Sequence, residues 1–305
     1  MLKIISISFF LFILATFISC KSKTASDDTR MLKFNLEKGK SYDYEMVMDM
    51  DQEVMNQKDK IGMIVAYVIN VADDNGTLKT LDVIYKDFKM NMNVRGQEII
   101  IDASKKPDSA ASTSADDFMQ MMTNAFSGII GKKFTMKVTE TGKIEEITGF
   151  DEIVSSMLES MAVNEEMKNL ISASLKDQFN SDKIKEAFAP MFSVYPNKEV
   201  KLGDKWNNTY DLSSMAVQCK SEYIVKSFQG DNILIDVTSQ MEPHGKIDNP
   251  ALSEMKMSGT QSGVMTLNSK SGLVVDAELT QHIETAGSLK MKITGKTKMR
   301  GKEKS

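Results

Sequence analysis

The sequence predicts an α+β protein: a duplicated, curved antiparallel β-sheet, half-barrel-like, with a central helical block packed on it. Three observations predict this class. Long segments alternate apolar and polar residues with a period of two, which is typical of half-buried strands. Residues 151–192 instead repeat apolar residues at helical spacing. Short motifs found before this helical block recur after it.

The clearest alternation lies in residues 36–50. One parity carries two tyrosines and three methionines, and the other carries mainly acidic and hydroxyl residues. Because a strand directs alternate side chains to opposite faces, the apolar set is expected to face the interior. A second strand, over 78–94, continues that inner face. The expected inward residues are Tyr42, Tyr44, Met46, Met48, Met50, Phe88, Met90 and Met92.

The remaining elements follow from turn and helix signals. The sequence "DDNG" at 73–76 predicts a hairpin turn. Residues 104–114 read as a loop, and an apolar stripe from Phe118 to Ile130 predicts a helix. Strands are expected again over 134–147, around a turn at Gly142, and from Val200 to the end of the chain.

Two pairs of motifs indicate the duplication. The hexapeptide "GKSYDY" at 39–44 matches "GDKWNN" at 203–208, since each has a glycine, two linking residues and then an aromatic residue. Likewise "FTMKVTETGKI" at 134–144 matches "VMTLNSKSGLV" at 264–274. The predicted division is a first β unit with a short helix at 31–149, a helical block at 150–197, and a second β unit at 198–305.

The first 30 residues predict export and lipid anchoring. Residues 1–19 contain Lys3 followed by a short apolar run, which is typical of a signal peptide. The ending "FISC" resembles a lipobox, so we expect Cys20 to carry fatty-acyl chains such as palmitate. Several chains on one residue hold a protein stably at a membrane. Residues 20–30 then comprise the lipidated cysteine and a flexible tether.

Composition and charge argue against a nucleic-acid partner and against an intramolecular disulfide. The chain has 38 basic and 42 acidic residues without a basic stripe, which argues against nucleic acid as a partner. Once Cys20 is lipidated, Cys219 has no partner for an intramolecular disulfide. Its alternation with Val217 and Tyr223 predicts a small buried hydrophobic residue.

We find no motif for catalysis, a cofactor or a metal, and predict a non-enzymatic protein. The two histidines, His244 and His282, have no nucleophile motif beside them, and "GTQSG" at 259–263 lacks the nucleophile-elbow spacing. The spacing "MVMDM" at 46–50 suits Cu(I), but methionine alternates in the same way on other strands. We therefore interpret the 24 methionines as interior residues, whose flexible thioethers also suit apolar ligands.

Two segments carry a family resemblance. The sequences "EVKLGDKW" at 199–206 and "GKKFTMKVTETGKIEEITGFDEI" at 131–153 resemble an uncharacterised family of Gram-negative lipoproteins, defined as a domain of unknown function. The layout also resembles lipoprotein carriers of the LolA and LppX type. That likeness implies lipid binding inside a curved sheet closed by helices.

The expected function is that of an envelope lipoprotein, held at the outer membrane by the lipid on Cys20, that binds a lipid or other amphiphile on its methionine and aromatic face. Two alternatives remain open. The first is a structural or assembly lipoprotein that binds other envelope proteins. The second is a hydrolase with convergent carboxylates, because distant acids can meet in a fold.

Overall fold

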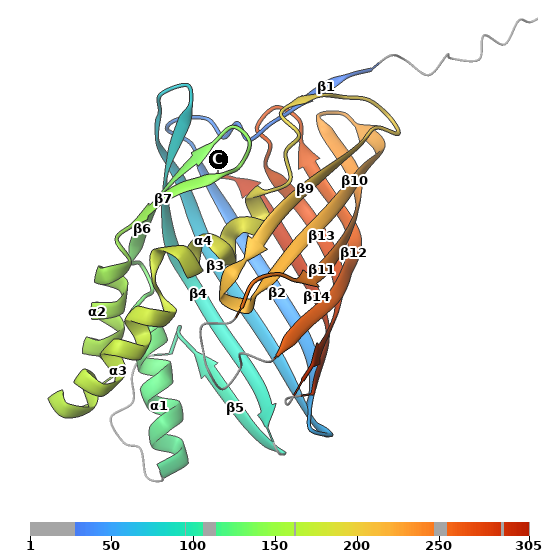
Figure 1. The fold of residues 1–305 in the computed structure, drawn as a ribbon. Helices are drawn as coiled ribbons and strands as arrows, with labels where there is room; N and C mark the ends of the chain where they lie inside the picture. The colour runs from blue at the N-terminus through green and yellow to red at the C-terminus, as the bar shows by residue number, and fades with distance from the viewer. Residues whose placement is uncertain are drawn as a thin grey trace, which may run out of the picture.

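The computed structural model describes residues 28–304 apart from 95, 106–113, 162, 247–254 and 288–289. The predicted signal peptide, Cys20 and most of the tether lie outside the described residues, while Arg30, the last tether residue, begins the first strand. A single 12-stranded antiparallel sheet dominates the fold (Figure 1). No helix in the described ranges is long and apolar enough to cross a membrane.

This architecture corrects the predicted fold class. The protein is mostly β, and the two expected β units are parts of one continuous sheet. Residues 291–303 pair with residues 42–54 in unbroken register, which joins the last strand to the first strand of the large sheet. The predicted duplicated half-barrel with a central helical block packed on it is therefore wrong, because one continuous curled sheet forms the body of the protein.

The strands follow one path around the molecule. Their order in the sheet is β7-β6-β4-β3-β2-β14-β13-β12-β11-β10-β9, with β5 paired to the lower part of β4. The bounds are β1 Arg30–Leu32, β2 Ser41–Val54, β3 Gln57–Asp74, β4 Leu78–Val94, β5 Gln97–Asp102, β6 Lys133–Thr139, β7 Ile144–Thr148, β8 Lys198–Val200, β9 Lys205–Leu212, β10 Val217–Gln229, β11 Asn232–Pro243, β12 Lys256–Asn268, β13 Val274–Ala286 and β14 Met291–Glu303.

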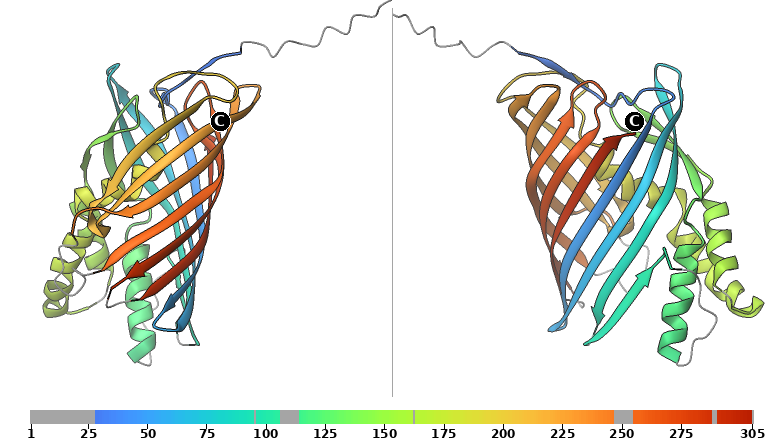
Figure 2. Two further views of the ribbon diagram at one scale, coloured as in Figure 1. Left: turned by 45° about the vertical axis from the view of Figure 1, so that its right-hand side comes forward. Right: turned by 180° about the vertical axis from the view of Figure 1, so that it is seen from behind.

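The helices do not form one layer over the sheet. Their bounds are α1 Ser114–Ser127, α2 Phe150–Ser160, α3 Glu165–Gln178 and α4 Ser181–Phe192. Helices α1, α2 and α3 lie together beside the β4–β7 side of the sheet (Figures 1 and 2). Helix α4 instead lies between the edge strands β7 and β9 and contacts both. Asn164 and Asn180 cap α3 and α4 by accepting a backbone N–H through their side chains.

Inward-facing glycines permit the tight curl of the sheet. At Gly263 on β12, an added Cβ would lie 2.0 Å from the carbonyl oxygen of Glu278 on β13. At Gly301 on β14, it would lie 2.3 Å from the carbonyl oxygen of Val274. Side chains at these positions would push neighbouring strands apart, so glycine lets the strands approach where the sheet bends.

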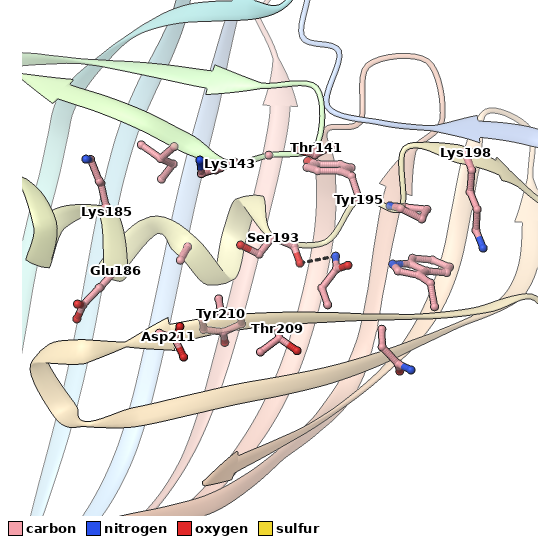
Figure 3. A pocket seen from close by; sticks show the side chains of 17 residues that line it. Thr141, Lys143, Lys185, Glu186, Ser193, Tyr195, Lys198, Thr209, Tyr210 and Asp211 are labelled. Carbon is pink, nitrogen blue, oxygen red and sulfur yellow. Dashed lines mark hydrogen bonds between the residues drawn. The ribbon is translucent and has the colours of Figure 1, made fainter. Parts of the chain in front are cut away.

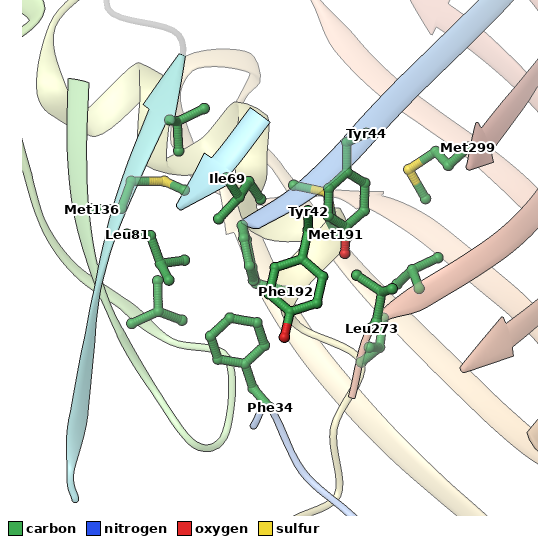
Figure 4. Close-up of a cluster of buried hydrophobic side chains, with 14 of the residues drawn as sticks. Phe34, Tyr42, Tyr44, Ile69, Leu81, Met136, Met191, Phe192, Leu273 and Met299 are labelled. Atoms are coloured by element: carbon green, nitrogen blue, oxygen red, sulfur yellow. The ribbon is translucent and has the colours of Figure 1, made fainter. Parts of the chain in front are cut away.

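The upper end of the curled sheet is closed by residues 32–36, the plug segment. Leu32, Phe34 and Leu36 are buried. The backbone N–H of Phe34 donates to Glu140 in the β6–β7 turn. The N–H of Asn35 donates to Ser271 in the β12–β13 turn. The Phe34 ring packs edge-on against Phe192, with 5.2 Å between centroids, in the cluster drawn in Figure 4.

The matched motifs have matched local structure. Gly39 and Gly203 both have φ near +82°, a backbone conformation that glycine adopts without steric cost. Their N–H groups donate to Val71 and Val225 respectively, each over 2.9 Å. These turns begin β2 and β9 in the same way, although both strands belong to the same sheet.

Candidate functional site: an apolar cavity inside the curled sheet

A cavity of about 450 Å³ lies inside the curled sheet, below the packed upper core. Its wall comes from β2–β4, β9–β14, the end of α1, the end of α3 and one side of α4. This volume is within the range of about 300–1,000 Å³ typical of small-molecule sites. The cavity is therefore large enough for a ligand and is formed mainly by rigid strands.

One wall of the cavity is apolar and rich in methionine. Met46 and Met48 on β2 lie opposite Val65 and Met63 on β3 in the register of the sheet. Phe88 on β4 continues this wall and stacks on Phe126 of α1, with 3.9 Å between ring centroids. Methionine side chains have three rotatable bonds, so this wall can adapt to apolar groups of different shape.

Helix α4 closes the side of the cavity between β7 and β9. Phe188, Pro190 and Met191 of this helix face the cavity. The hydroxyl of Tyr67 on β3 donates to the sulfur of Met191 over 3.2 Å, which ties the helix to the far wall. Two features of the chain thus position the wall: the capped start of α4 at Asn180 and this buried contact near its end.

The opposite wall carries a row of polar residues that sequence reasoning missed. Ser221, Ser239, Gln261 and Gln281, on β10, β11, β12 and β13, occupy the same level of the sheet because each is the register partner of the next. We call these four residues the polar row. The hydroxyls of the two serines hydrogen-bond to each other over 2.8 Å. The sequence signal was polar residues on the inward parity of otherwise apolar strands.

The structure brings together only part of the predicted ligand-binding set. Met46, Met48 and Phe88 line the cavity. Tyr42 and Tyr44 are buried in the packed core above it, and Met90 packs beside the Phe88 cluster. The remaining two, Met50 and Met92, lie one level lower, where both pair with Ile61 of β3. Whether any of the eight contacts a ligand stays a prediction.

A second depression, of about 740 Å³, is an open groove on the outer surface (Figure 3). It lies between the β6–β7 turn, α4 and β9, and it presents Lys143, Lys185, Glu186 and Asp211. In this groove the amide of Asn208 donates to the carbonyl oxygen of Ser193 over 2.9 Å. This contact anchors edge strand β9 to the end of α4.

Titratable groups provide no catalytic constellation in the described ranges. The pKa values of Asp73, Asp74, Asp102 and Glu284 are lowered, chiefly by side-chain hydrogen bonds from Lys38, Lys79, Ser104 and His282. In that part of the chain, no group of three or more His, Cys, Asp or Glu residues could hold a metal ion.

The sequence prediction for Cys219 is confirmed. Cys219 is buried, together with Val217 and Tyr223 on its strand face. Burial raises the pKa of the Cys219 thiol, which disfavours the reactive thiolate. His244, which follows β11, and His282 on β13 are both exposed.

The fold and the cavity define a mostly β protein with an apolar, methionine-lined interior. The chain belongs to the family of unknown function DUF6263, whose family model matches residues 76–274. This finding confirms the predicted membership of an uncharacterised family. No curated protein matches the sequence.

Several solved structures show a distant likeness. The beta domain of the Bordetella autotransporter BrkA is 6% identical, with a TM-score of 0.27 over 85% of this chain and 98% of that chain. Pseudomonas aeruginosa OccK5 (OpdH) is 7% identical, with a TM-score of 0.23 over 89% of this chain and 100% of that chain. TM-scores this low do not establish a shared fold, and no functional conclusion follows from them.

Proposed function

We propose that this protein is a lipid-anchored protein of the cell envelope that binds a hydrophobic or amphiphilic small molecule in its interior cavity. One observation carries the proposal: the curled sheet leaves a space of about 450 Å³ lined by Met46, Met48, Met63 and Phe88 instead of packing shut. A cavity of this size costs free energy when it is empty, because its lining loses van der Waals contacts. A ligand recovers those contacts.

The lining favours an apolar ligand. Burial of apolar surface contributes about 25 cal/mol per Å² of surface removed from water, and most of the cavity surface is carbon and sulfur. Mobile thioethers let the wall follow an acyl chain or a ring without a fixed shape. The ligand role proposed for Met46, Met48 and Phe88 rests on their position in this wall.

The same observation favours ligand binding over the assembly alternative. An exposed apolar patch or strand edge together with a filled interior would favour a scaffold protein. Here the interior holds a cavity, whereas strongly exposed apolar side chains such as Met55 and Leu170 are scattered on separate elements. The hydrolase alternative has no support among the described carboxylates, since each resolved pKa shift of an acid is downward.

Binding can be tested with N-phenyl-1-naphthylamine, an uncharged probe that fluoresces in apolar surroundings. The full-length protein would be held in an amphipathic polymer, with protein-free polymer as the blank. Thr297→Trp fills the cavity from β14, and Thr294→Trp places the same side chain on the opposite face of that strand. We expect saturable binding that Thr297→Trp weakens at least about tenfold and Thr294→Trp leaves unchanged. Equal binding by both variants would place the probe outside the cavity.

The anchor is tested separately. Cys20→Ala removes the sulfur that carries the lipid, so the protein should move from the membrane fraction to the soluble fraction after cell breakage. Cys219→Ala is the matched control, because it removes the buried thiol and leaves the lipobox intact. Mass spectrometry of the native protein that finds no acyl chains on Cys20 would contradict lipid anchoring. Protease treatment of intact cells then distinguishes the cell surface from the periplasm.

A further inference from the structure

The polar row lies between two apolar levels of the inner face; its serines are buried, and its glutamines, Gln261 and Gln281, are partly exposed in the cavity. The level above it in the register contains Val237, Gly263 and Leu279. The level below contains Cys219, Met241 and Ile283, all buried. Polar side chains in such surroundings lose free energy unless they find hydrogen-bond partners.

The serines and the glutamines of the polar row differ in their hydrogen bonding. Ser221 and Ser239 satisfy each other and are each 3% exposed. Gln261 and Gln281 lie opposite each other on β12 and β13. Within the described ranges, neither carboxamide has a side-chain hydrogen bond to another protein group. Together, the two amides provide donors and acceptors that point into a cavity and remain available.

The described lining of the cavity is uncharged. Among the described residues, no Asp, Glu, Lys, Arg or His side chain lines the cavity. An ionised group placed there would lose its hydration and gain no counter-charge. A neutral polar group would lose less solvation free energy. The carboxamides would take the place of the water molecules that it had hydrogen-bonded in solution. A lining of this kind favours uncharged polar groups over ionised ones.

We propose that the ligand is an uncharged amphiphile whose polar group, such as an amide, ester or hydroxyl, hydrogen-bonds to the carboxamides of Gln261 and Gln281. Its apolar part then lies against Met48 and Met63 on the facing wall. This inference rests on the proposed ligand-binding function and specifies its substrate class. Free fatty acids and other anionic amphiphiles are poor ligands under the same reasoning.

Decanamide and decanoate provide a matched test, because they share a chain length and differ in the charge of the head group at pH 8. Each would displace N-phenyl-1-naphthylamine from the full-length protein in amphipathic polymer. We expect decanamide to bind at least about tenfold more tightly than decanoate. The carboxylate of decanoate is ionised and finds no counter-charge in the cavity, whereas the amide is neutral. Protein-free polymer corrects for partition of each compound.

Substitution of the carboxamides identifies the contact. The double variant Gln261→Leu and Gln281→Leu should weaken decanamide binding about tenfold, because the head group loses its partners. The variant should still bind the naphthylamine probe. Gln240→Leu is the matched control, since this glutamine is exposed on β11 outside the cavity. Circular dichroism and the melting temperature would verify that each variant is folded.

The outcomes separate the two proposals. If the probe and both decanoyl compounds fail to bind, the proposed ligand-binding function is wrong, and this inference fails with it. If the probe binds and decanoate equals or exceeds decanamide, ligand binding stands and the preference for uncharged head groups is refuted. If decanamide binds the double variant as tightly as the native protein, Gln261 and Gln281 do not hold the head group.

Discussion

Replacement of Phe34 by alanine tests whether the plug segment is a structural part of the curled sheet. The Phe34 side chain is 1% exposed. Its ring lies 5.2 Å from the ring of Phe192 at the end of α4 and 5.7 Å from that of Tyr195. The same segment is hydrogen-bonded to the β6–β7 and β12–β13 turns. Truncation therefore opens a cavity at the point where the plug segment, α4 and the sheet meet.

The expected cost follows from that burial. Truncation of a fully buried phenylalanine to alanine destabilises a protein by about 3–5 kcal/mol, because transfer free energy is lost and the void is only partly refilled. At this chain length, each kcal/mol lowers the melting temperature by about 2–4 °C, so Phe34→Ala should lower it by about 10 °C. Urea unfolding followed by circular dichroism measures the free energy directly.

A neighbouring residue provides the control for Phe34→Ala. Met31 is 46% exposed on β1, three residues before Phe34, and Met31→Ala should change stability by less than about 0.5 kcal/mol. A loss below about 1 kcal/mol for Phe34→Ala would refute the reasoning, because it would mean that the plug segment is not packed into the upper core. A loss of similar size in Met31→Ala would indicate a general effect of truncation near the N-terminus.

Three further predictions concern the sheet and its interior. Gly263→Ala should lower the free energy of unfolding by about 1–3 kcal/mol, because the added methyl group overpacks the sheet. Gly62→Ala should be nearly neutral, since an added Cβ there would lie 3.7 Å from its nearest neighbour, an oxygen of the Asp49 side chain. Thermal melts of the two variants test this difference. Ser221→Ala should cost about 1–3 kcal/mol by leaving Ser239 without its partner, and replacing both serines should cost less, as a double-mutant cycle would reveal. Burial raises the pKa of Tyr223 to about 12. The unfolded chain ionises this tyrosine near pH 10, so Tyr223 by itself should lower the free energy of unfolding by about 2–3 kcal/mol between pH 10 and 12, in addition to the effect of the other buried tyrosines. A Tyr223→Phe protein should lose less stability over that range, and identical urea titrations of both proteins would contradict the prediction.

The predicted strands and helices depended on local periodicity, and many match the structure. Tyr42, Tyr44, Met46, Met48 and Met50 alternate with polar residues, and the structure places this set on the inner side of β2. The hairpin between β2 and β3 had no such local signal. It turns through Met55 and Asn56, both with positive φ, and methionine seldom adopts that conformation.

The apolar wall of the candidate cavity was also predictable from the sequence. The methionines of the apolar wall were visible as an alternating pattern, because each strand records its own inner face. Each member of the polar row was visible only as a polar residue on the inward parity of its own strand. That the four form one row was not visible, because they are separated by as many as 60 residues and become neighbours only through the register of β10–β13.

The sequence alone determined which residues form strands, which side of each strand faces inward, and that the chain belongs with an uncharacterised family. These properties are local, since they depend on side-chain alternation over a few residues. Only the tertiary structure decided that β14 pairs with β2, that the sheet curls around one interior, and that α4 lies between β7 and β9. Strand pairing across more than 200 residues depends on register, twist and inward glycines such as Gly263, which act together only in the assembled sheet.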